Sequence, residues 1–276
     1  MKTLLHVELV KLRHQRLVLT TFALCLISAL ILPQLTWLFG ESSASERGFH
    51  VLGRALELSM LLACYLLLLQ ASMSMVVERH DRTLRGSLVA PVRRRDIVLA
   101  RWFALQLTIV LLVVTIVAAA AASTAFHFTF GDVYEEAIEP LAEATELRTH
   151  VALGVLHLVL PLVALVSVGF FISVFTRSPA TAAGLSLGAL FLLDISKSMV
   201  PGSSPLRLYF FNSYLPTLFD RSSYLHGATA YAQGIADLLW LPDAPEHVCG
   251  VVVPLVTGGV CLLAALWLFT RRDWTE

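Results

Sequence analysis

The chain has 276 residues, of which 57% are hydrophobic and only 14% are charged, whereas soluble domains carry roughly a quarter charged residues. The charges gather between long apolar runs, which is typical of an α-helical membrane protein with several spans. The formal net charge is zero, so no overall positive field points to a nucleic-acid partner. None of the four cysteines forms a CxxC pair, so we expect small apolar packing residues rather than metal or redox chemistry.

Residues 1–16 are predicted to form an amphipathic helix along the membrane surface. Three leucines share one face and four basic residues supply positive charge: Leu5, Leu9, Leu12, Lys2, Lys11, Arg13 and Arg16. This combination suits the inner leaflet, where basic side chains meet anionic headgroups. A plain cytoplasmic extension of the first span is the alternative. The apolar run that follows is too long for a cleaved signal peptide, so we expect it to be retained.

Six apolar runs are long enough to cross the hydrocarbon core, which takes roughly 20 helical residues. They cover about residues 17–39, 51–77, 97–126, 151–175, 180–199 and 248–270. Pro161 predicts a kink in the fourth run. A tight turn at 176–179 would join the fourth and fifth runs as a helical hairpin. The chain is therefore predicted to be a single all-α, polytopic transmembrane domain with six membrane-spanning helices.

The 20 Lys and Arg residues are distributed unevenly between the two predicted sides of the membrane. Fourteen lie on the side of both termini: Lys2, Lys11, Arg13, Arg16, Arg79, Arg82, Arg85, Arg93, Arg94, Arg95, Arg101, Arg177, Arg271 and Arg272. The positive-inside rule therefore predicts that both termini are cytoplasmic, in the inner membrane. The opposite side carries an acidic segment, 132–146, which we interpret as a solvated face and not as a cation site.

Two segments on the outer side are predicted to contain short helices. Segment 127–150 has good helix formers, and Pro140 would begin or break a helix there. Segment 200–247 is rich in aromatic residues, which suit the membrane–water interface, and 228–240 is predicted to be a helix on or in the bilayer. Asp194 and Lys197, three residues apart on one face of the fifth span, could form an ion pair at the outer boundary. A buried functional charge is the sharper alternative.

A charged segment, 78–96, joins the second and third predicted spans. Its residues 83–89 can form a short helix with an apolar patch, and Pro91 would end that helix. A short surface helix between two spans is suited to contact with a partner protein. An ordinary basic loop on the cytoplasmic side explains the same residues equally well.

The segment resembles the corresponding link of the ABC-2 family of ABC-transporter permeases. In that family a Glu ends the second span, a Gly-Thr-Leu-like element follows, leucines lead to Pro-Val-Ser-Arg, and a basic residue opens the third span. The matching residues are Glu78, Thr83, Leu84, Leu88, Pro91, Val92, Arg94, Ile97 and Arg101. Arg82 stands where Gly is usual, and Arg93 stands where Ser is usual.

The resemblance implies a transmembrane subunit of an ABC transporter, usually an exporter. Two permease subunits, a second copy or a homologue, would pair with two cytoplasmic ATPase subunits. Segment 78–96 would dock in a groove of the ATPase. The coupling residues would be Glu78, Arg82, Thr83, Leu84, Leu88, Pro91, Arg94 and Asp96.

The chain has no GxxxxGK[ST] sequence and no Gly-Lys pair, so we expect no ATP hydrolysis by the P-loop mechanism. ATP and Mg are expected on the partner ATPase, and no cofactor, metal or catalytic residue is expected on this chain. An ion-gradient-driven secondary transporter is the main alternative. The polar residues within spans are few, and we interpret His157 as a packing residue. A GxSxG match at 184–188 also reads as GxxxG, and we interpret it as a helix-packing face and not as a nucleophile elbow.

Overall fold

The apolar runs form long helices because a helix satisfies every backbone hydrogen bond within its own segment, as a membrane requires. The computed structural model describes residues 2–39, 48–81, 93–135, 139–200, 204–216 and 244–271. Its helices are α1 (Lys2–His14), α2 (Arg16–Phe39), α3 (Gly48–Met73), α4 (Val76–His80), α6 (Arg94–His127), α7 (Ala144–Phe175), α8 (Pro179–Met199) and α10 (Ala244–Arg271). Two strands, β1 (Val133–Glu135) and β2 (Glu139–Ala142), and two 3-10 helices, η2 (Pro205–Tyr209) and η3 (Phe211–Tyr214), complete the described elements.

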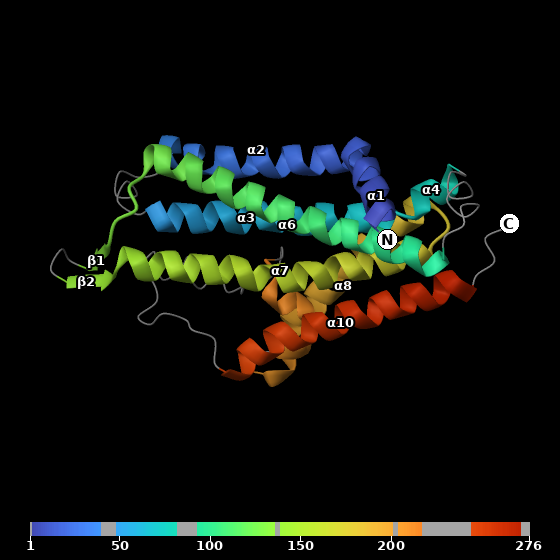
Figure 1. Cartoon of the computed structure of the whole chain (residues 1–276). Coiled ribbons are helices and arrows are strands. Elements are labelled where there is room, and N and C mark those ends of the chain that lie inside the picture. Colours follow the sequence, from blue (N-terminus) through green and yellow to red (C-terminus); the bar gives the residue numbers. More distant parts are fainter. Residues whose placement is uncertain are drawn as a thin grey trace.

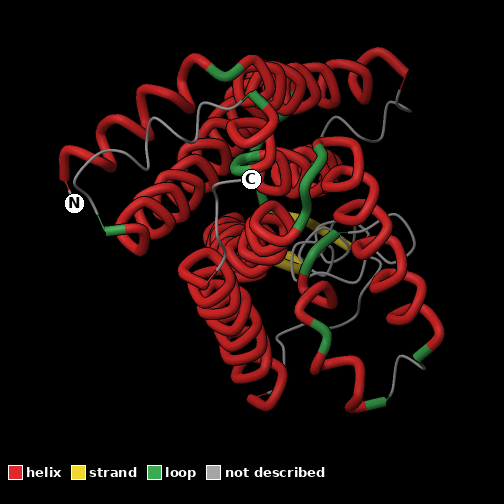
Figure 2. The backbone as a smooth tube through the Cα atoms, turned by 90° about the vertical axis from the view of Figure 1, so that its right-hand side faces the viewer, coloured by secondary structure: helices red, strands yellow, loops and turns green. Residues whose placement is uncertain are grey.

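The long helices form a bundle whose two ends differ (Figure 1). Helices α1 and α4 and the end of α10 lie at one end, which we call the α1 end, and the two strands lie at the other, the hairpin end. In the view along the bundle the strands lie behind the helices (Figure 2). Six helical segments of the described chain are long and apolar enough to cross a membrane, with α3 and α4 counted as one. The prediction of six candidate spans is confirmed.

Helices α3 and α7 lie at the centre of the bundle and are the most buried of the six. Helix α7 packs along α3 on one side and along α10 on another, and α2 packs against α3 and α6. The α3–α7 contact is close because Gly169 carries no side chain. A Cβ there would lie 2.9 Å from the Leu68 carbonyl oxygen and 3.0 Å from the Ala71 Cβ. Between α6 and α7, the Trp102 indole donates a hydrogen bond to the Ser167 hydroxyl at 2.9 Å.

The prediction of short helix in segment 127–150 is wrong for its middle part. Strands β1 and β2 pair antiparallel there, with Tyr134 opposite Pro140. Pro140 fits because a strand of a two-stranded sheet has one edge without a ladder partner, so its missing N–H costs nothing on that side. Helix α7 begins just beyond, and the Asp132 carboxylate accepts a hydrogen bond from the Ala144 amide at 2.7 Å. Part of the acidic segment therefore satisfies the first turn of α7.

Segment 200–247 is described over 204–216 and from Ala244 onward. Its described part contains the short η2 and η3 helices, as expected of a long connection. Phe211 and Tyr214 are buried, while Tyr209 is exposed, so only some of its aromatic side chains are available to an interface. The predicted helix at 228–240 lies outside the described residues.

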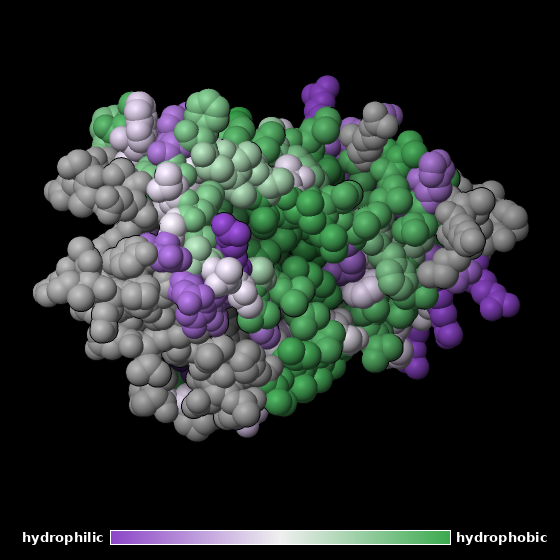
Figure 3. All heavy atoms as spheres, turned by 60° about the vertical axis from the view of Figure 1, so that its left-hand side comes forward, coloured by the Kyte–Doolittle hydropathy of each residue, from purple (hydrophilic) through white to green (hydrophobic). Residues whose placement is uncertain are grey.

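The described surface is apolar across the middle of the bundle. Figure 3 shows a broad hydrophobic region between more hydrophilic groups toward both ends. Large side chains that are about half exposed occur on α2, α6 and α10, among them Leu19, Val114 and Val260. Such a surface suits contact with lipid chains or other membrane helices, not with water.

Candidate coupling site

The second span changes direction just before it reaches the charged segment. Helix α3 ends at Met73, a turn follows at Ser74 and Met75, and α4 begins at Val76. The Met75 amide donates a hydrogen bond of 2.8 Å to the Ser173 hydroxyl of α7. Because this site is buried, an unpaired amide here would be costly. The α7 side chain therefore replaces a backbone partner at the break between α3 and α4.

Helix α4 presents Glu78 to an arginine of α6. The Glu78 carboxylate accepts two hydrogen bonds from the Arg101 guanidinium, one of them 2.8 Å between Nη1 and Oε2. Arg101 is only 1% exposed. A two-pronged arginine–carboxylate contact fixes both direction and distance. It therefore ties the end of the second span firmly to the start of the third.

Helix α1 contributes two more charges to the same cluster. Glu8 lies 3.1 Å from the Arg101 Nε, and Lys11 lies 3.0 Å from Glu8 and 3.4 Å from Glu78. Two carboxylates and two cations thus meet with balanced formal charge. We call Glu8, Lys11, Glu78 and Arg101 the junction network. It joins α1, α4 and α6 at the α1 end.

Arg79 connects the neighbouring part of α4 to α7. Its guanidinium donates hydrogen bonds to the backbone carbonyl oxygens of Thr176 and Val174, the latter at 3.3 Å. The last carbonyl groups of a helix lack partners within the helix and carry partial negative charge. Arg79 satisfies two carbonyls at the end of α7, so the adjacent residues of α4 hold α6 and α7 through opposite charges.

Comparison with protein families shows to which family the chain belongs. The model of a family described as "ABC-2 family transporter protein" matches residues 4–187, about two thirds of the chain. The chain belongs to the ABC-2 transporter family. Comparison with curated proteins gives no match. The match begins in α1 and ends within α8, so it includes all four members of the junction network.

The resemblance to the ABC-2 family that the sequence indicated is confirmed. The structure describes three of the predicted coupling residues of this ABC-2 chain. Glu78 lies in the junction network. Arg94 and Asp96 lie in the first turn of α6, where Arg94 is exposed and Asp96 is half-buried. The other predicted coupling residues, Arg82, Thr83, Leu84, Leu88 and Pro91, lie outside the described residues, as does the short helix predicted for 83–89.

Asp194 and Lys197 are both fully buried in the ABC-2 chain. The Lys197 ammonium donates a hydrogen bond of 3.2 Å to the Asn212 backbone carbonyl of η3. Lys197 therefore fastens η3 to α8. Their pairing as an ion pair at the outer boundary stays a prediction.

The helix-packing face predicted at 184–188 has no glycine contact within the described residues and stays a prediction. A Cβ at Gly184 or Gly188 would meet nothing within 4 Å in this part of the chain. Helix α8 instead turns Ser186 inward, where its hydroxyl donates a hydrogen bond of 3.2 Å to the Ser72 hydroxyl. The described residues contain no group of three or more His, Cys, Asp or Glu that could hold a metal ion.

Glu8 was not predicted from the sequence, and Arg101 was predicted only as part of the family motif. A signal for Glu8 was present. It lies among Leu5, Leu9 and Leu12 on the same helical stripe, so a carboxylate interrupts an apolar face. In the structure this stripe faces the protein: Leu12 is buried in the core, and Leu5 and Leu9 pack against it. A buried carboxylate needs a cation or several donors, so the position predicts a basic partner.

Proposed function

We propose that this chain is the permease subunit of an ABC exporter, driven by a separate ATPase that docks on segment 78–96. Two permease chains would form the substrate path, and ATP and Mg would be bound by the ATPase subunits. The α1 end would face the cytoplasm of a cell with an inner membrane. Membership of the ABC-2 transporter family and six apolar helices support a transport role.

The observation that carries the proposal is the junction network. It lies beside both described ends of segment 78–96, because Glu78 begins that segment and Arg101 follows its last residue by five positions. A force applied to the segment would reach α4 and α6 together. Glu8 and Lys11 would pass it to α1, and Arg79 would pass it to the end of α7. In this scheme the network transmits force and takes part in no chemical step.

Exposed basic residues at the start of α6 suit the docking step. Arg94 and Arg95 are exposed, whereas Arg101 is buried in the network. An acidic surface on an ATPase would attract the first two without disturbing the third. Docking and transmission are thus assigned to different residues and can be tested separately. In the same proposal α1 lies along the inner leaflet with its exposed Val7 and Val10 against lipid.

Docking is tested by affinity purification of the tagged full chain from its own cells. A Walker-type ATPase should accompany the wild type and be lost from Arg94→Glu. Arg16→Glu is the matched control, because Arg16 is exposed at the start of α2, outside segment 78–96. Equal recovery of the ATPase with Arg94→Glu and wild type would contradict docking at this site. Transport that persists without ATP and follows a proton gradient would replace the proposal with a secondary transporter.

Transmission is tested on the purified complex. Replacing Glu78 by Gln and Arg101 by Met removes the central ion pair while keeping similar side-chain volumes. We expect the ATPase to bind but the permease to lose its influence on ATP hydrolysis. Hydrolysis regulated as in the wild type would show that force does not pass through the network.

A further inference from the structure

A hollow opens between α7 and α10 at the α1 end, separate from the junction network. Its volume is about 470 Å³, and Phe175, Arg177, Leu268 and Arg271 line it. That volume is in the range of sites for small molecules. Phe175 ends α7, Arg177 lies in the turn before α8, and the other two lie in the last turns of α10. Two cations and two apolar side chains therefore share one opening.

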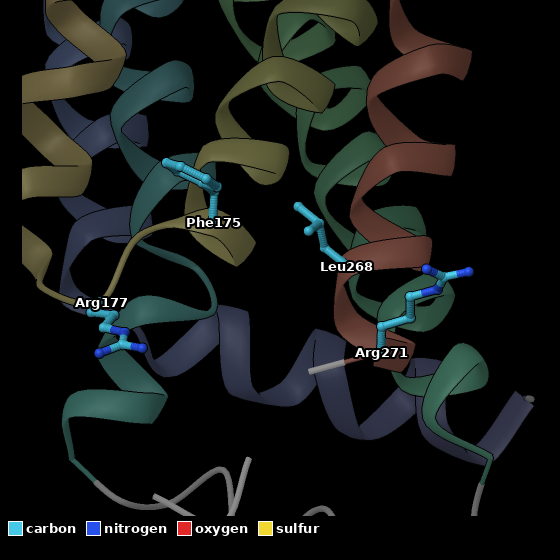
Figure 4. Close-up of a pocket in the computed structure, with 4 residues that line it drawn as sticks. All are labelled: Phe175, Arg177, Leu268 and Arg271. Carbon is cyan, nitrogen blue, oxygen red and sulfur yellow. The ribbon is translucent and has the colours of Figure 1, made fainter. Parts of the chain in front are cut away.

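The two kinds of side chain occupy different levels. Figure 4 shows Phe175 and Leu268 farther into the bundle, with Arg177 and Arg271 nearer its end. A molecule that fits must place an anionic group at the end of the bundle and an apolar part along the helices. A phospholipid at the membrane boundary has this polarity. A soluble anion would use only the arginines.

The arginines have no acidic partner within the described part of the chain. The ion pairs of the junction network involve Glu8, Lys11, Glu78 and Arg101, and neither arginine of the hollow takes part in them. The carbonyl groups at the end of α7, which could otherwise attract Arg177, accept hydrogen bonds from Arg79. The Arg271 guanidinium lies 4.5 Å from the centre of the Trp267 ring. This contact orients the guanidinium but leaves its positive charge uncompensated.

The surrounding side chains suit the boundary of a bilayer. Trp267 is 53% exposed and Phe175 is 57% exposed. A tryptophan next to an arginine at the end of a span is typical of the headgroup level. Basic pockets between spans on the cytoplasmic side are suited to anionic headgroups.

We infer that the hollow between α7 and α10 binds an anionic phospholipid of the inner leaflet. Arg177 and Arg271 contact the phosphodiester, and Phe175 and Leu268 contact the first part of the acyl chains. The inference relies on the proposed cytoplasmic orientation of the α1 end. It requires no ATPase, so it can fail or succeed independently of the proposed docking.

The test uses the full chain in detergent without an ATPase, with phosphatidylglycerol and phosphatidylcholine as probes. Native mass spectrometry measures how much of each lipid stays bound. We expect preferential retention of phosphatidylglycerol, and about a fivefold loss of apparent affinity for Arg177→Gln and for Arg271→Gln. Arg16→Gln is the matched control and should bind as the wild type does.

A second measurement locates the lipid. Phosphatidylglycerol with brominated chains should quench tryptophan fluorescence, and Trp267→Phe should remove part of that quenching. Equal retention of both lipids, or no effect of Arg177→Gln and Arg271→Gln, would overturn the inference. Displacement of the lipid by soluble glycerol phosphate would also overturn it, because the site would then be one for a soluble anion. If Arg177→Gln and Arg271→Gln lose the ATPase in the affinity purification described above while lipid retention is unchanged, the hollow is a contact site for the protein partner and the inference is overturned.

Discussion

The junction network and the hollow between α7 and α10 both contain arginine, and both lie at the α1 end. They differ in what surrounds the positive charge. Arg101 is buried and meets the carboxylates of Glu8 and Glu78. Arg271 is exposed and rests on an aromatic ring, with no acidic partner in the described chain. The same residue type therefore has a structural role in one region and is available for binding in the other.

This contrast shows that a count of basic residues does not reveal what each of them does. Such a count predicts the orientation of a membrane protein from the number of Lys and Arg on each side. It does not separate cations that neutralise internal carboxylates from cations that face lipid or a partner. Here the separation depends on Glu8, Glu78 and the helices that bring them to Arg101.

The largest effect is expected for Arg101→Met. It would leave the buried Glu8 and the half-buried Glu78 carboxylates without their arginine, and breaking a buried pair in this way costs about 3–5 kcal/mol. The measurement is the thermal unfolding temperature of the full chain in detergent. Arg271→Met, in the other region, should leave it nearly unchanged. Adding Glu78→Gln to Arg101→Met should recover part of the lost stability. Equal destabilisation by Arg101→Met and Arg271→Met would contradict the difference between the two regions.

Gly169→Ala should act on the close packing contact between α3 and α7. The new Cβ would crowd the Leu68 carbonyl oxygen and the Ala71 side chain, and overpacking of this kind costs about 1–3 kcal/mol. We expect a lower unfolding temperature because α3 and α7 would pack less closely. Gly184→Ala is the control, because nothing in the described chain lies within 4 Å of its Cβ. A tolerated Gly169→Ala would mean that the α3–α7 contact is less close than described.

Arg79→Gln should affect both regions, since Arg79 follows Glu78 and binds the end of α7. Loss of charged hydrogen bonds to the helix terminus should cost about 1–2 kcal/mol. It should also weaken phosphatidylglycerol retention, because the freed carbonyls can then compete for the arginines of the hollow. Unfolding and lipid retention are measured on the same preparation. Lipid binding that is unchanged while stability falls would separate Arg79 from the hollow.

Lys11→Gln should have the smallest effect. The Lys11 side chain is 36% exposed, so water screens its pairs with Glu8 and Glu78, and an exposed pair contributes at most about 1 kcal/mol. We expect a small decrease of the unfolding temperature that shrinks as salt is added. A loss as large as that of Arg101→Met would mean that Lys11, not Arg101, holds the network together.

The apolar pattern predicted the spans because length and hydropathy alone define a membrane-crossing helix. The family resemblance singled out Glu78 and Arg101 at the two ends of the link. Neither kind of pattern contains distances between helices. The pairing of Glu8 with Arg101 spans 93 positions of the sequence, and only the packing of α1 beside α6 makes it.

The hairpin shows a different limit. Pro140 and its helix-forming neighbours indicated a short helix, but pairing with residues 133–135 prevailed. Local preference is weak where so few residues are involved. The burial of Lys197 likewise depends on η3, which packs against it from outside α8. A single-sequence pattern on α8 carries no information about that partner.

The turn between α3 and α4 has a mechanical consequence. An unbroken helix bends only if several backbone hydrogen bonds change together, whereas this turn is closed by the Ser173 hydroxyl bound to the Met75 amide. The hydrogen bond at this turn contributes about 1 kcal/mol, and the contacts of Glu78 and Arg79 add to it in holding α4 against α6 and α7. We expect Ser173→Ala to remove this hydrogen bond and to make hydrogen exchange of the Met75 amide faster. Unchanged exchange would contradict the role of Ser173 at the turn.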